Sequence, residues 1–164
     1  ILGVVFAQRQ RQIPSIAAVI VLIFMFWLFV AHALFALFLG LQAAARLGTS
    51  PMVLFQGNGP LMLLIGTAIG AGFAGVLFAT TVTGLPLLLE YEVDFVTAMI
   101  TSVQSVLANL VPMALWGITI AALVFVGMAP LFLGLFVVLP VLGHATWHMY
   151  RRLMPPARRV GAMA

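Results

Sequence analysis

Long runs of hydrophobic residues, interrupted by few polar positions, dominate the pattern along this chain. Between Arg11 and Arg46 lie 34 residues without a formal charge. The apolar part of this run extends from Ile13 to Leu41. Since about 20 helical residues, each rising about 1.5 Å, cross a bilayer core, it predicts one long membrane helix. A second apolar run, Leu61 to Leu88, predicts a second crossing, because glycines and prolines break the chain between the two.

The region from Phe95 to Tyr150 contains 56 uncharged residues, which is too many for one crossing. In residues 95–109, apolar side chains recur at helical spacing with Thr, Ser and Asn between them. This pattern predicts an amphipathic helix that lies in the membrane interface or covers other helices, with Asp94 able to act as its N-cap. The remainder divides at the turn-like sequence GMAP, Gly127 to Pro130, into expected spans over 112–129 and 130–150.

The composition gives the same picture, because 65% of the residues are hydrophobic and 6% are charged. A soluble domain carries roughly 25% charged residues, so lipid must solvate most of this chain. We therefore expect an all-α polytopic membrane protein with four transmembrane helices and one amphipathic interfacial helix. Residues 1–164 would form a single membrane domain. Since the chain begins at Ile1 rather than methionine, we expect it to be the C-terminal part of a longer protein.

The charges predict an orientation. The chain has seven basic residues, all arginine, and three acids. Four spans leave Arg46 alone on one side and place the other arginines together on the opposite side: Arg9, Arg11, Arg151, Arg152, Arg158 and Arg159. Because basic residues concentrate on the cytoplasmic side, both ends of this chain are expected to be cytoplasmic.

The arginines are too few and too scattered for a nucleic-acid partner. The absence of cysteine excludes disulfides and thiolate metal sites.

Small residues in the second predicted span indicate close helix packing. GAGFAG, Gly70 to Gly75, matches the dinucleotide fingerprint, but that motif requires a preceding strand and a soluble βαβ unit. Inside a membrane helix, small residues instead let helix backbones approach closely. We therefore interpret Gly66, Gly70, Ala71 and Gly75 as a helix-packing groove.

Three histidines are the candidate cofactor ligands. His144 and His148, in HATWH, have the spacing of a zinc-protease motif but lack its glutamate, so we expect no such chemistry. A His pair at i and i+4 could still hold part of a metal site, but we assign no metal ligand. They share one helical face, and His32 lies about 20 Å from them in depth along its own span. This chain alone therefore cannot hold a haem between two histidines. His32, His144 or His148 could still contact a haem or quinone with another chain. The alternative is a hydrogen bond to a neighbouring group.

Aromatic and basic residues follow the histidines at the end of the last predicted span. Trp147 and Tyr150 are typical of the headgroup level, and Arg151 and Arg152 can reach phosphates. This group predicts an interface anchor in contact with membrane lipids. A ligand or quinone contact is the alternative.

The three acids, Glu90, Glu92 and Asp94, lie together at the end of the second predicted span. We expect these acids to pair with Arg151 or Arg152, or to cap the amphipathic helix. Both roles are favoured over a role in proton relay. No acid then remains inside the membrane, which counts against a proton- or ion-coupled transporter made by this chain alone. No nucleophile–base pair can be named, so we expect no catalytic residue and no enzyme.

Three passages carry a family resemblance: GLPLLLEYEVDF, AMITSVQSVLANLVPMALW and LFLGLFVVLPVLGHATWHMYRRL. With these, the chain resembles, over about Ile13 to Leu153, the bacterial integral-membrane family known as domain of unknown function 2189. The matching motifs are Pro86 to Glu90 and Leu142 to Arg151. The resemblance implies a location in the bacterial inner membrane and a longer whole protein. Some members are labelled as components of cytochrome c oxidase, which implies a link to respiratory complexes.

The sequence thus favours a non-catalytic accessory subunit that packs against other membrane subunits of a larger respiratory or electron-transfer complex. No cofactor is required for that role. One alternative is a membrane redox protein that binds haem or quinone. Another is an oligomeric transporter or channel.

Overall fold

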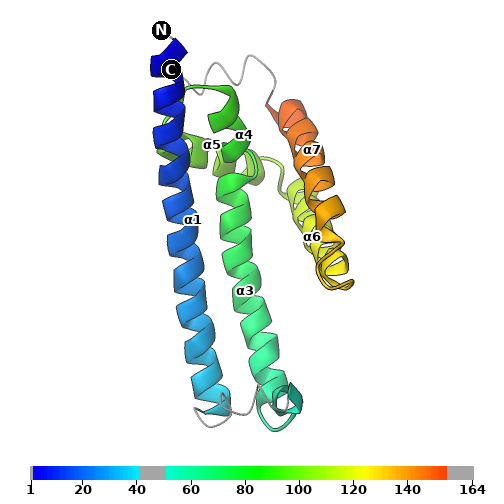
Figure 1. Cartoon of the computed structure of the whole chain (residues 1–164). Helices are drawn as coiled ribbons and strands as arrows, with labels where there is room; N and C mark the ends of the chain where they lie inside the picture. The colour runs from blue at the N-terminus through cyan, green and yellow to red at the C-terminus, as the bar shows by residue number, and fades with distance from the viewer. Residues whose placement is uncertain (1, 41–50, 155–164) are drawn as a thin grey trace. The chain divides into compact units, whose positions relative to one another are not determined.

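The structure, a computed structural model, describes residues 2–40 and 51–154, and every regular element in these two ranges is helical (Figure 1). The expected all-α fold is confirmed. The elements are α1 (Leu2–Leu39), the short 3-10 helix η1 (Pro51–Phe55), α3 (Gly59–Thr81), α4 (Gly84–Glu90), α5 (Phe95–Leu107), α6 (Leu110–Met128) and α7 (Leu135–Leu153).

Three segments of the described chain are long and apolar enough to cross a membrane: Ile13–Leu39, Gly59–Glu90 and Leu110–Met128. They confirm a polytopic membrane protein. The fourth expected span, 130–150, falls largely on α7, which is 19 residues long but carries histidines and arginines in its second half. These polar residues lower its hydropathy, so composition alone does not identify α7 as a span, and the fourth crossing stays a prediction.

Several expected boundaries differ from the helices found. The expected helix over 61–88 is interrupted at Val82 and Thr83, between α3 and α4. The first expected span, 13–41, ends at Leu39 because Gly40 takes φ +75°, a left-handed conformation that terminates helices. The helix of the last expected span, 130–150, begins at Leu135, because the preceding residues form the turn.

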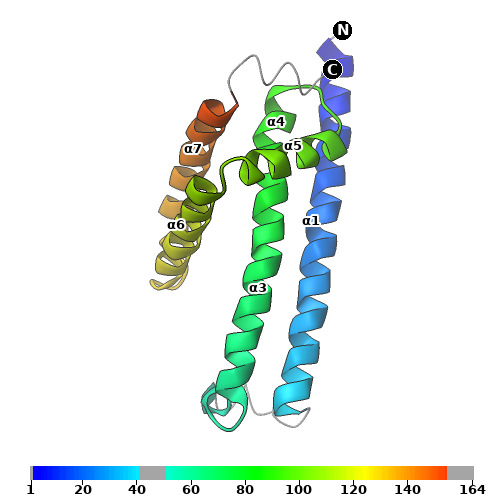
Figure 2. The same cartoon turned by 180° about the vertical axis from the view of Figure 1, so that it is seen from behind.

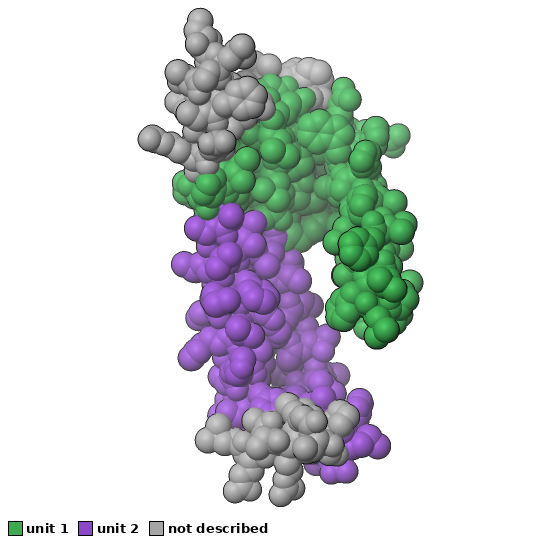
Figure 3. Space-filling view, viewed as in Figure 1, with its two compact units in different colours: residues 1–16, 78–164 green, residues 17–77 purple. Residues whose placement is uncertain are grey.

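The chain divides into two compact units, and the single membrane domain expected over residues 1–164 stays a prediction. Unit 1 comprises residues 1–16 and 78–164, and unit 2 comprises residues 17–77; Figure 3 colours them separately. Within unit 1, α4 packs on α5, α5 touches α6, and α6 packs on α7. Figure 2 shows α5 lying across α4. The buried core of unit 1 centres on Val82, Val106 and Met113.

A tight turn joins α6 and α7 into a helical hairpin. Leu131 and Phe132 both take positive φ, 50° and 66°, although neither is glycine. Gly127 and Gly134 meet beside this turn, so closely that a Cβ added to Gly134 would lie 2.7 Å from the Gly127 carbonyl oxygen. The two glycines therefore permit the close approach that closes the hairpin.

In unit 2, the helical segments of α1 and α3 lie side by side (Figures 1 and 2). Aromatic side chains fill part of the space between them. The ring of Phe73 lies 5.8 Å from that of Phe26 and 5.7 Å from that of Trp27, measured between ring centroids. Both pairs are tilted, an arrangement that aromatic quadrupoles favour.

Candidate functional site

The acid cluster and the aromatic end of α7 meet in unit 1. The Tyr150 hydroxyl donates a hydrogen bond of 2.7 Å to Oε2 of Glu90, the last residue of α4. Tyr150 is fully buried, and the ring of Trp147 packs on it with a centroid distance of 5.6 Å. The ends of α4 and α7 are thus joined by a short polar contact between residues that are 60 positions apart.

The other two acids have different surroundings. Asp94 is the N-cap of α5, as the sequence indicated, and its carboxylate accepts hydrogen bonds from the Thr97 backbone N–H at 2.8 Å and the Thr97 hydroxyl at 2.6 Å. These bonds favour the charged form and hold the pKa of Asp94 below its ordinary value of 3.8. Glu92 is exposed. Capping is therefore observed for one member of the acid cluster.

Arg151 and Arg152 are exposed in the last turn of α7. Among the described residues neither arginine forms an ion pair with the acids, and the observed partner of Glu90 from α7 is Tyr150. Tyr150 is consequently a buried link between helices, and its expected place in an anchoring belt at the headgroup level stays a prediction. Trp147 is half-buried beside it, and the two arginines are free to reach lipid phosphates.

The three histidines are exposed and are not gathered into one site. Nδ1 of His144 lies 3.2 Å from the Pro140 carbonyl oxygen, four residues earlier on α7, and Nδ1 of His32 lies 2.7 Å from the Leu28 carbonyl oxygen on α1. Both imidazoles therefore make the neighbouring hydrogen bond that was the alternative to ligand binding. In the described ranges, no three His, Asp or Glu side chains lie close enough to share a metal ion.

The inner face of α5 combines small and polar residues with the apolar side chain of Val106. Ala98, Ser102 and Ser105 are buried, although the sequence had placed Ser105 between the apolar positions. Ser102 Oγ accepts a 3.2 Å hydrogen bond from the Thr83 backbone N–H, in the break between α3 and α4. A Cβ added to Gly84 would lie 3.1 Å from the Ala98 carbonyl oxygen. Small residues thus allow α5 to sit directly on α4, and large apolar side chains such as Ile100 and Leu107 face outward.

An apolar groove of about 510 Å³ runs along unit 1. Pro86 and Leu89 of α4 line one wall, and Leu139, Gly143 and Trp147 of α7 line the other. Val124 of α6 lies among the lining residues, and Thr146 is one of the few polar ones. No histidine lines this groove. Sequence reasoning missed it, because its walls come from helices whose pairing no local pattern encodes.

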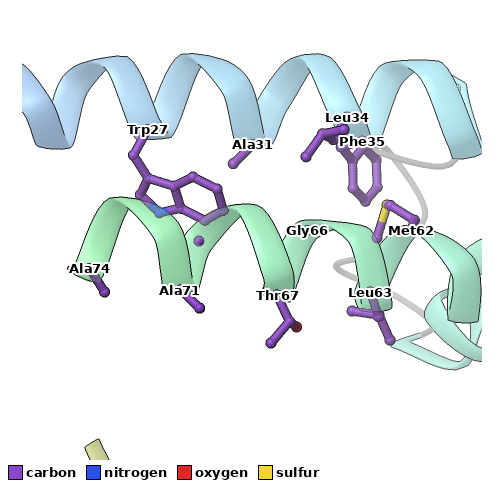
Figure 4. A pocket seen from close by; sticks show the side chains of 11 residues that line it. Trp27, Ala31, Leu34, Phe35, Met62, Leu63, Gly66, Thr67, Ala71 and Ala74 are labelled. Atoms are coloured by element: carbon purple, nitrogen blue, oxygen red, sulfur yellow. The ribbon is translucent and has the colours of Figure 1, made fainter. Parts of the chain in front are cut away.

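A second groove, of about 520 Å³, lies in unit 2 between α1 and α3. Figure 4 shows Trp27 reaching from α1 to α3, where its ring would lie 3.0 Å from a Cβ on Gly70. Gly66 and Ala71 also line this groove, and Figure 4 labels both. Gly75, five residues after Gly70, is rotated by about 140° around the helix axis. Gly66, Gly70 and Ala71 thus line the groove between α1 and α3, whereas Gly75 is not among its lining residues.

The outward face of α3 carries its own row of small residues. Ala68, Ala71, Gly72 and Gly75 recur at intervals of three and four, and all four are exposed. A Cβ added to Gly72 or Gly75 would meet nothing within 4 Å. We call these four residues the small-residue face.

Comparison with known proteins identifies a family for the first half of the chain. Residues 1–90 match the family described as "Predicted integral membrane protein (DUF2189)". The match includes the motif Pro86 to Glu90 but ends before Leu142 to Arg151, so the resemblance of that second motif stays a prediction. No curated protein and no solved structure matches the chain.

Proposed function

The chain belongs to this family of integral membrane proteins (DUF2189), and from that premise we propose that it is a non-catalytic subunit that packs against other membrane helices of a larger complex. Its role would be structural, through helix contacts within the bilayer, without a reaction of its own. The charge distribution supports both ends of the chain being cytoplasmic, and the family resemblance supports a location in the bacterial inner membrane. The label that some family members carry supports a respiratory or other electron-transfer complex as the partner.

The observation that supports this proposal is the small-residue face of α3. Small side chains in a membrane helix allow another backbone to approach closely, where dispersion contacts and weak hydrogen bonds hold the helices together. Here the face lies open, because Gly72 and Gly75 meet no other part of the described chain. The glycine that α1 does use, Gly70, lies on the opposite side, so the chain leaves a second, unfilled packing surface on the same helix.

The test is to purify the complex from native membranes in a mild detergent, with a tag on this chain. We expect the chain to run on a native gel well above its own 17.6 kDa, together with other membrane subunits. The double substitution Gly72→Leu with Gly75→Leu should release it, because two leucines would hold a partner helix away from α3. Gly143→Leu is the control, since it makes the same change at an open glycine on another helix, α7.

A chain that runs alone from native membranes would exclude an accessory subunit. If the complex survives the double substitution unchanged, its contacts lie elsewhere and the small-residue face is not the docking surface. Recovered subunits without any redox centre would refute the electron-transfer assignment while leaving the packing role in place.

A further inference from the structure

The groove in unit 1 descends from the charged end of α7 into the apolar part of the hairpin. Its lining on α7 runs from Trp147 back to Leu139, eight residues or about 12 Å along the helix axis. On the facing side, the lining runs in the same direction from Leu89 of α4 back to Phe78 near the end of α3. One end of the groove therefore lies beside Trp147, and the other is surrounded by apolar side chains.

A basic residue follows the polar end of this groove on the same side of α7. Arg151 comes four residues after Trp147 and eight after Gly143, so the three share one helical face. Among the described residues Arg151 makes no ion pair, and it is exposed. The Thr146 hydroxyl also lines the groove and has no hydrogen bond within the described part of the chain. The groove is thus apolar along its length, with a donor and a positive charge at one end.

We propose that this groove is a binding site for one anionic phospholipid. An acyl chain would lie along the apolar walls, the Thr146 hydroxyl would donate to an ester carbonyl, and the phosphate would meet the Arg151 guanidinium. Basic pockets between membrane helices recognise anionic headgroups in this way, and a guanidinium binds phosphate oxygens through paired N–H groups. The site lies within unit 1 and does not depend on a partner subunit.

The nearby acids do not remove this charge complementarity. Glu90 accepts the hydrogen bond of Tyr150, and Asp94 is engaged at the start of α5. Glu92 and Asp94 are exposed at this end, but no acid lines the groove. A phosphate in the groove would meet the Arg151 guanidinium on the groove's own side of α7.

Native mass spectrometry of the detergent-purified full chain tests the proposal, with phosphatidylglycerol or phosphatidylcholine of identical acyl chains added. The wild-type chain should retain phosphatidylglycerol about fivefold better, the gain expected for one arginine near the headgroup. Arg151→Gln should abolish that preference while leaving the fold unchanged, because the side chain is exposed. Gly143→Leu should reduce retention of both lipids, since a Cβ there meets nothing within 4 Å and the larger side chain would occupy the groove.

Gly72→Leu is the matched control, because it makes the same change at another open glycine, outside this groove. In the lipid experiment, Gly72→Leu should retain lipid as the wild type does. In the native-gel experiment, Gly143→Leu should leave assembly with partner subunits intact, so the two proposals can fail independently. Equal retention of the two lipids by the wild-type chain would overturn the proposal, and so would a Gly143→Leu variant that binds like the wild type. A quinone extracted from the wild-type chain but absent from Gly143→Leu would overturn it in favour of a different occupant.

Discussion

At the scale of single residues, the hydrogen bond between Tyr150 and Glu90 links two distant parts of the chain. The sequence indicated that Glu90 would be engaged at a helix end but not by which group, because the partner lies 60 positions away. It also indicated that Tyr150 has one apolar and one polar end, which fits an interface belt and a buried hydrogen bond equally well. Only the packing of α7 against α4 distinguishes the two.

Tyr150→Phe removes this donor and leaves the ring in place. Because the carboxylate of Glu90 would lose a charge-assisted hydrogen bond in a half-buried setting, we expect a loss of about 1–3 kcal/mol in the free energy of unfolding. Unfolding by sodium dodecyl sulfate in mixed micelles measures it. Tyr91→Phe, one residue beyond α4, is the control and should change the free energy by less than about 0.5 kcal/mol. Equal effects of the two variants would show that the bond does not stabilise the contact.

Asp94 gives a prediction that depends on pH. Its pKa is lowered in the folded chain by the side-chain and backbone hydrogen bonds of Thr97. A lowered pKa means that the charged cap stabilises the fold above the ordinary value of 3.8 and that this contribution is lost as the pH falls through the folded pKa. Asp94→Ala should therefore cost about 1 kcal/mol at pH 7, and the difference from the wild type should shrink below pH 4.

The measurement is the free energy of unfolding of both proteins between pH 7 and pH 3. Asp94→Asn is the control, because asparagine can cap the helix without titrating. Its stability should stay close to that of the wild type at neutral pH. A difference between wild type and Asp94→Ala that is constant down to pH 3 would contradict a role for the carboxylate charge.

At the scale of elements, the close approach of Gly127 and Gly134 allows the α6–α7 hairpin to form. A Cβ on Gly134 would lie 2.7 Å from the Gly127 carbonyl oxygen, so Gly134→Ala must push backbone against backbone. We expect a loss of about 1–3 kcal/mol, the usual cost of overpacking. Gly143→Ala on the same helix is the control and should have little effect, because its Cβ would lie in open space. If the two variants unfold at the same detergent concentration, the hairpin is looser than its geometry indicates.

The positions of the elements could be predicted well, but their packed faces could not. The break between α6 and α7 follows from the glycine and proline of GMAP, and the start of α5 follows from Asp94. The break at Val82 and Thr83 carries no proline or glycine of its own, so the apolar run concealed it. Hydrophobic periodicity placed Val106 on the apolar side of α5 but did not predict the buried serines, because lipid as well as protein can cover large apolar side chains. Ala98 and Ser102 face inward because only small residues fit against Gly84.

At the scale of the whole molecule, contacts within unit 1 bear on how often the chain crosses the membrane. Composition identifies three spans, the last of which is α6. The turn after α6 reverses the chain, and the hydrogen bond from Tyr150 to Glu90 brings the end of α7 back to the end of the second span. α7 is 19 residues or about 28 Å long, enough to cross a hydrocarbon core. Its polar residues cluster in the second half, where a returning helix would reach the headgroups.

We therefore predict that α7 is a fourth crossing, and the absence of cysteine makes the test direct. Single cysteines at Glu92, Ala129 and Arg152 occupy exposed positions and can be labelled from either side of a sealed vesicle with an impermeant maleimide. With four crossings, Glu92→Cys and Arg152→Cys react from the same side and Ala129→Cys from the other. If α7 instead lay along the surface, Arg152→Cys would react together with Ala129→Cys. In that case the hydrogen bond between Tyr150 and Glu90 could not form in the membrane, and the lipid groove that depends on the same helix pairing would be lost with it.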